Sequence, residues 1–154
     1  MDVKEQLAKV LQDEQDVILT SFNNQDAWEL GCLMVNMAKE QGINLTISID
    51  INGQKIFYYA FENTHLNNEN AVARKSRVAH VFRCSSMKVF LELQATGTKI
   101  SDRGRDPMEY LAMGGAVPIR LKDTGMIGTV CVSGLAHPDD HQFVINAMKA
   151  FIRR

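Results

Sequence analysis

The segment at positions 44–61, NLTISIDINGQKIFYYAF, constrains the fold more than any other part of the chain. It places Asn52-Gly53, a dipeptide that favours a two-residue turn, between two runs in which apolar and polar residues alternate. A turn of this length pairs Ile51 with Gln54 and thereby fixes the register of the two runs. The sequence therefore predicts an antiparallel β-hairpin in this segment.

The predicted register assigns every side chain of this hairpin to one of two faces. Ile49 is expected opposite Ile56 on an apolar face, and Asp50 is expected opposite Lys55 on the other face, where the opposite charges favour the pairing. Phe57 would then lie on the second face, with Asp50. We expect this aromatic face to need cover from a helix or from a second subunit.

The remaining segments are predicted from their hydrophobic periodicity. Apolar residues at helical spacing predict helices near both ends of the chain, after residue 23, and in two further segments between residues 67 and 96. The apolar, β-branched run at 17–22 (VILTSF) predicts a strand, and residues 116–133 predict a second hairpin. We therefore expect one α+β domain over residues 1–154, with an antiparallel sheet of about five strands flanked by helices.

The composition limits the class of protein. The chain has 154 residues, of which 45% are apolar and 23% charged, and its net charge is −1. These values are typical of a globular protein and give no general attraction to nucleic acid or to an anionic membrane surface. No apolar run is long enough to span a bilayer. Cys32, Cys84 and Cys131 are widely spaced and odd in number, so we expect reduced thiols in a cytoplasmic protein.

Residues 137–141, HPDDH, place two histidines and two aspartates directly after a predicted strand. If Pro138 lies in the first turn of the last helix, the two aspartates complement the positive end of the helix without any ligand. Alternatively, His137 and His141 are four residues apart, a spacing that allows zinc binding on one helical face. We favour the helix-start interpretation, because His137 falls at the helix cap, and we predict no metal site.

Three cationic residues, Arg74, Lys75 and Arg77, lie in a predicted helix, and Lys75 falls within its apolar stripe. In the simpler interpretation the Lys75 stem is buried while its ammonium reaches water or pairs with a carboxylate. In the alternative, the three cations line a pocket that receives a carboxylate or phosphate. The sequence leaves both interpretations open.

Two small motifs flank the predicted second hairpin. Gly114-Gly115 permits a tight approach of the backbone before the strand, and such a pair can also let backbone amides approach an anion. Ser133, near His137 at the end of the hairpin, would be a nucleophile only if a base lay beside it, and no GxSxG motif is present. We favour structural roles for both motifs without excluding a ligand.

Several longer motifs occur in a recognisable order. They are DAWELG at 26–31, RKSRVAHVFRCSS at 74–86, GGAVPIRL at 114–121 and GTVCVSGLAHPDDHQFV at 128–144. Over nearly its whole length the chain resembles a small uncharacterised cytoplasmic group, a UPF family, within the haem-degrading-domain superfamily. That superfamily also includes HbpS-like and GlcG-like proteins and the C-terminal domain of PduO-type proteins.

This resemblance implies a profilin-like fold in an HbpS-like domain, and a homo-oligomer whose second copy would cover the aromatic strand face. It also implies that Gly114-Gly115, Pro118-Ile119 and residues 132–134 contribute to a pocket. Haem is the cofactor that the resemblance suggests, but it assigns no iron ligand. By chemistry alone, the candidate iron ligands are His65, His80, His137 and His141.

Three functions are compatible with the sequence. The first is an oligomeric binding module for a small anionic ligand such as haem or another tetrapyrrole. The second is an adaptor that presents a protein-binding surface, and the third is a haem-degrading or metal-dependent enzyme that uses His137 or His141. We rank them in this order and assign no catalytic residue. The predicted ligand-binding residues are Arg74, Lys75, Arg77, Gly114, Gly115, Ser133, His137 and His141.

Overall fold

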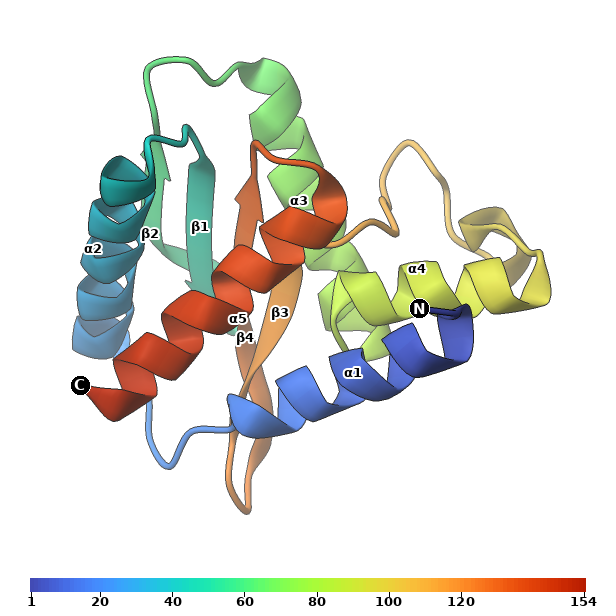
Figure 1. Ribbon diagram of the computed structural model, residues 1–154, viewed down its shortest axis with the longest axis horizontal. Helices are drawn as coiled ribbons and strands as arrows, with labels where there is room; N and C mark the ends of the chain where they lie inside the picture. Colours follow the sequence, from blue (N-terminus) through green and yellow to red (C-terminus); the bar gives the residue numbers. More distant parts are fainter.

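Four antiparallel strands form the central sheet of the computed structural model, which describes residues 1–154 (Figure 1). Their spatial order is β2-β1-β4-β3, so the two hairpins join through the pairing of β1 with β4. The strands are β1 (Thr46–Ile51), β2 (Gln54–Ala60), β3 (Ala116–Leu121) and β4 (Gly125–Ser133). The helices are α1 (Val3–Asp16), α2 (Asn24–Gln41), α3 (Leu66–Phe82), α4 (Ser86–Thr96), the 3-10 turn η1 (Ile100–Arg103) and α5 (His137–Arg153).

The strand predicted at residues 17–22 is wrong, so the sheet has four strands rather than about five. This segment makes a single parallel bridge, in which the Leu19 amide donates to the Arg120 carbonyl and the Leu19 carbonyl accepts from the Lys122 amide. Val17 and Phe22 are nevertheless buried in the core. The apolar pattern therefore reflects burial of a connecting segment and not membership of the sheet.

The first hairpin has the predicted turn and the predicted pairing of Asp50 with Lys55, but its register differs from the prediction beyond that pair. Ile51 pairs with Gln54 as expected, and a β-bulge then inserts Ile56, so that Ile49 faces Phe57. The bulge reverses the faces of the following residues and moves Phe57 into the core, where it is buried beneath α2. A side chain at Gly31 of α2 would collide with the Phe57 ring, so the glycine permits this packing.

The last helix begins as the simpler interpretation of HPDDH predicts. Pro138, Asp139 and Asp140 lie in its first turn, as predicted. The predicted cap is wrong by one residue, because the N-cap is Ala136 and His137 is the first residue of the helix. The cap residue itself provides no side-chain hydrogen bond, so the two carboxylates are the acidic groups that complement the helix dipole.

The two faces of the sheet have different chemistry. Helices α2 and α5 cover one face, and 21 buried apolar residues from them, the strands and residues 17–22 form the main core there (Figure 1). Helix α3 covers the other face, where the buried sheet residues are largely polar. These residues are Thr46, Ser48, Asp50, Thr129 and Ser133. Buried polar groups cost stability unless they form hydrogen bonds.

Candidate functional site

Lys75 projects from α3 into the interior and is only 3% exposed. Its Nζ lies 3.0 Å from Oδ2 of Asp140 in the first turn of α5 and 3.2 Å from the carbonyl oxygen of Val132. Asp140 Oδ1 accepts a hydrogen bond from the Leu135 amide. Burial raises the pKa of Asp140, while Lys75 and the Leu135 amide oppose that shift. Lys75 thus pairs with a carboxylate, as the simpler interpretation of the sequence predicts, and this ion pair links α3 to α5.

Gly114 lies against His137, and Gly115 lies against Lys75. The Gly114 amide donates to Nδ1 of His137 over 3.0 Å. Gly115 has a φ of 140°, and a Cβ there would lie 2.6 Å from the Val132 carbonyl oxygen and 2.9 Å from Lys75 Nζ. The structure therefore brings together four of the predicted residues, and the absence of side chains at the glycines allows their close contact.

His137 has the environment of a neutral hydrogen-bond acceptor. Burial and the charge of Lys75 both lower its pKa, and its ring packs edge-on against Phe90 with the centroids 4.4 Å apart. A neutral imidazole leaves Nδ1 able to accept from Gly114, as observed. The hydrogen bond from the Gly114 amide to His137 thus holds the segment before β3 against the first turn of α5.

His141 lies apart from His137 and contacts a different helix. It is 3% exposed, and its Nε2 lies 3.1 Å from Oδ2 of Asp13 in α1, while its Nδ1 is buried with no hydrogen-bond partner. Burial alone would raise the pKa of Asp13, but hydrogen bonds from His141 and Lys9 lower it overall. No group of three or more His, Cys, Asp or Glu side chains is arranged to hold a metal ion.

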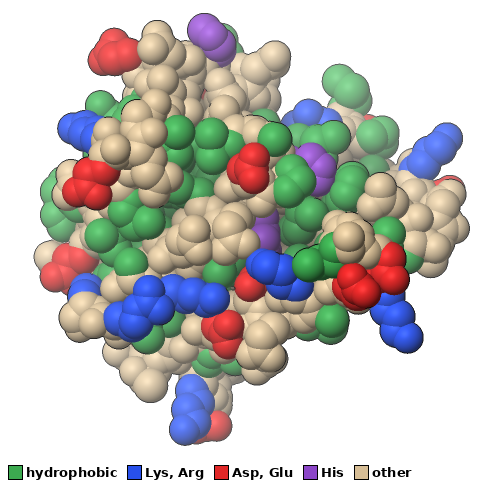
Figure 2. Space-filling view, viewed as in Figure 1, with side chains coloured by type: hydrophobic (Ala, Val, Ile, Leu, Met, Phe, Trp, Pro, Cys, Tyr) green, Lys and Arg blue, Asp and Glu red, His purple; other side chains and the backbone are tan.

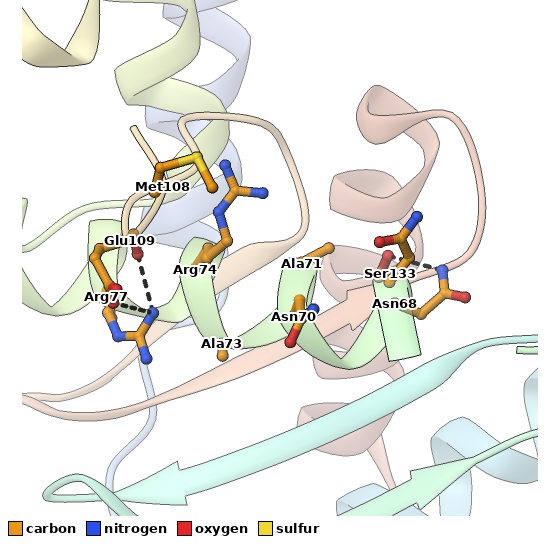
Figure 3. A pocket seen from close by; sticks show the side chains of 10 residues that line it. Asn68, Asn70, Ala71, Ala73, Arg74, Arg77, Met108, Glu109 and Ser133 are labelled. Carbon is orange, nitrogen blue, oxygen red and sulfur yellow. Dashed lines mark hydrogen bonds and ion pairs between the residues drawn. The ribbon is translucent and has the colours of Figure 1, made fainter. Parts of the chain in front are cut away.

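Arg74, Arg77 and Ser133 line a cavity of about 700 Å³ on the outer side of α3 (Figure 3). Met108 and Glu109, from the loop at residues 105–112, line its other side. Ser133 Oγ accepts from the Asn68 amide over 3.2 Å and has no histidine partner. The full lining is Asn67, Asn68, Asn70, Ala71, Ala73, Arg74, Arg77, Met108, Glu109 and Ser133. Lys75, the glycine pair and both C-terminal histidines lie outside this lining.

The two arginines of the cavity are held by the facing loop. Arg74 Nη2 donates to the Pro107 carbonyl over 2.6 Å, and Arg77 Nη1 lies 3.3 Å from Oε2 of Glu109. Arg74 Nε is buried without a hydrogen-bond partner. Because buried N–H groups are nearly always paired, this donor has capacity for an additional acceptor.

The sequence interpretation missed the asparagines of this cavity. Asn67, Asn70, Arg74 and Arg77 are spaced by three, four and three residues, which places them on one helical face. This polar stripe beside the apolar one indicates a polar site on the helix. Met108 and Glu109 gave no such signal, because they lie in an irregular segment far along the chain.

The three cysteines form no disulfide, as their number and spacing predict. Cys32, Cys84 and Cys131 are free, and burial raises the pKa of Cys84 to about 11 and that of Cys131 to about 12.

Figure 2 shows cationic and anionic side chains interspersed with hydrophobic surface on the face that carries α1 and α5. None of the helices combines the length and apolar character needed to cross a membrane.

Comparison with known proteins places this fold and sequence in a family. A UPF0303 protein of Yersinia pseudotuberculosis is 37% identical over 153 residues, which cover 99% of this chain and 90% of the relative. The crystal structure of the Ybr137w protein matches with a TM-score of 0.87 and 27% identity, over 96% of this chain and 87% of that one. A PduOC:heme complex matches with a TM-score of 0.70 and 17% identity, over 88% and 96% of the two chains.

The sheet flanked by helices is the profilin-like arrangement expected from the resemblance. Residues 22–149 match the family described as haem degrading protein HbpS-like. This match covers most of the chain, and the UPF0303 relative covers 99% of it. The chain therefore belongs to the HbpS-like family.

Proposed function

We propose that the protein binds a small anionic ligand in the cavity between α3 and the loop at residues 105–112. The observation that carries this proposal is that Arg74, Arg77, Ser133 and three asparagines line one hollow. The cavity volume of about 700 Å³ lies within the range of small-molecule sites. Guanidinium groups and amides recognise carboxylates and phosphates through directed hydrogen bonds.

Haem fits this cavity only in part. The two arginines suit its propionates, but only three of the ten lining residues are hydrophobic, and no histidine lines the cavity. Met108 is the one lining side chain with a sulfur that could contact iron. One structural neighbour is a PduOC:heme complex, which makes haem a ligand worth testing. The lining itself favours a smaller, more polar anion.

Ligand titration tests this proposal. Citrate, a polar polycarboxylate, and haemin are titrated separately into the protein, with calorimetry for the first and visible absorbance for the second. We expect saturable citrate binding that weakens in Arg74→Gln by about 1.5–3 kcal/mol, or roughly tenfold to a hundredfold, because a charge-assisted hydrogen bond is lost. Arg153→Gln, which removes an exposed arginine elsewhere, should bind as the wild type does.

The outcomes separate the candidate ligands. Haemin binding that is lost in Met108→Ala would favour a haem protein over a binder of small polar anions. Saturable binding of neither probe, or an equal loss in Arg74→Gln and Arg153→Gln, would contradict the proposal. Thermal melting of each variant checks that Arg74→Gln, which also loses its contact to Pro107, remains folded.

We also propose that the protein self-associates through the outer side of α2 and the edge strand β2. Trp28 is 58% exposed and Tyr59 40% exposed, although both are large and apolar. With Cys32, Val35 and Phe57 they line a largely apolar hollow of about 260 Å³. An exposed apolar surface beside an unpaired sheet edge is typical of a protein contact surface.

Native mass spectrometry measures this association. We expect the wild type to form an oligomer and Trp28→Glu to shift it to smaller species, because a charge would be buried in the contact. Leu11→Glu, at an apolar side chain of α1 that is 48% exposed, is the matched control and should leave the oligomer intact. A monomeric wild type would refute self-association, and a monomer that co-purifies with a stoichiometric partner protein would favour the adaptor function.

A further inference from the structure

We propose that the protein has a second binding site, for a small oxyanion, between α3 and the β1–β2 hairpin, built around His80 and Asp50. This site goes beyond the ligand cavity proposed above. The hollow here measures about 210 Å³, enough for a small carboxylate, sulfate or phosphate but much less than the first cavity offers. His80 and Ser76 enter it from α3, and Ser48 and Asp50 enter it from β1.

Asp50 holds the His80 ring in one orientation. His80 Nε2 lies 3.0 Å and 3.1 Å from the two carboxylate oxygens of Asp50. The same carboxylate accepts hydrogen bonds from the Thr129 hydroxyl and from the Gly53 amide. This arrangement directs the proton of Nε2 to Asp50, and the second nitrogen, Nδ1, is left to donate to a ligand when the ring is protonated.

The charges around this hollow favour an anion. The Asp50 carboxylate is occupied by His80, by the Thr129 hydroxyl and by the Gly53 amide. Lys55 lies over the Tyr58 ring, 4.5 Å from its centroid, and pairs with no carboxylate. Glu69 also lines the hollow, and burial together with the Glu69 charge raises the pKa of Tyr58. The Lys55 ammonium, the protonated His80 ring and the serine hydroxyls thus provide the donors that an oxyanion needs.

Protonation of His80 controls the strength of this site. The hydrogen bond to Asp50 raises the pKa of His80, while burial and the charge of Arg83 oppose that shift. The imidazolium therefore persists to higher pH than in an ordinary histidine, and anion affinity should fall as pH rises through the raised pKa. The titratable and charged groups that face this ring or line the same hollow are Asp50, Lys55, Tyr58, Glu69, Arg77 and Arg83.

The two proposed sites can be tested separately. They share Ala73 and Arg77 on α3, but Arg74 lines only the larger cavity and Lys55 lines only the smaller hollow. Arg74→Gln should therefore weaken the first site and spare the second, whereas Lys55→Met should do the reverse. Arg77 is left unchanged, because it borders both.

Nuclear magnetic resonance of the histidine rings tests the second site. The chain has four histidines, so loss of one ring signal in His80→Gln assigns His80. Sodium acetate and sodium sulfate are titrated at constant ionic strength against sodium chloride, and the pKa of His80 is measured in each salt. Acetate represents a carboxylate ligand. Sulfate represents a phosphate, with a charge that stays constant through the titration.

We expect at least one of the two oxyanions to shift the His80 signal saturably and to raise its pKa. An anion that binds the imidazolium about tenfold more tightly than the neutral ring raises that pKa by up to about one unit. Lys55→Met should reduce the effect and Arg74→Gln should leave it unchanged. His80 behaviour that is the same in all three salts, or an equal shift of all four histidines, would overturn the proposal.

Discussion

Replacing Lys75 with methionine is expected to lower the free energy of unfolding by about 3–5 kcal/mol. The Asp140 carboxylate lies 3.0 Å from the Lys75 ammonium, and both side chains are almost fully buried. Removing the ammonium leaves an uncompensated charge in the interior, where water cannot solvate it. Urea unfolding monitored by circular dichroism measures the change.

A double variant separates the ion pair from the packing of the lysine stem. Lys75→Met combined with Asp140→Asn removes both charges while the amide oxygen can still accept from the Leu135 amide. We expect it to recover most of the lost stability, because replacing both members of a buried pair is far less destabilising than removing one. A single Lys75→Met variant within about 1 kcal/mol of wild type would contradict a strong pair.

Gly115→Ala is expected to be the second most damaging substitution. The residue has a φ of 140°, and its Cβ would press on the Val132 carbonyl and the Lys75 ammonium. Backbone strain contributes about 1–3 kcal/mol and steric overlap a similar amount. Thermal and urea unfolding measure this loss of stability.

Gly125→Ala is the matched control for this prediction. Gly125 also has a positive φ, 116°, but a Cβ there would meet nothing within 4 Å. Its variant should show only the strain, so Gly115→Ala should be less stable than Gly125→Ala by about 1–3 kcal/mol. Equal losses in the two variants would show that the contact with Lys75 and Val132 is unimportant.

Local sequence patterns predicted most of the fold. They failed where the conformation of a segment depends on its packing against residues far away in the sequence. Asn52-Gly53 determined the first turn because its conformation depends on the dipeptide itself. The bulge at Ile56 depends on the fit of Phe57 beneath α2, where Gly31 leaves space. Neither the bulge nor the isolation of residues 17–22 from the sheet could be read from alternation alone.

The candidate sites show the same limit. Lys75 stood out because a cation interrupted an apolar stripe, but its partner Asp140 lies 65 residues away in sequence. The pairing of His80 with Asp50 depends likewise on how α3 crosses the sheet. The outer cavity also needs the irregular segment around Met108, whose course no periodicity describes.

The unlike faces of the sheet have a consequence for how such a chain can diversify. The 21 apolar residues that dominate stability lie under α2 and α5, whereas both proposed sites border α3 on the opposite side. Exchanges at exposed positions such as Asn67 and Asn70 therefore leave the main core untouched. Such a scaffold can acquire new chemical preferences through a few replacements on one helix while its folding is preserved.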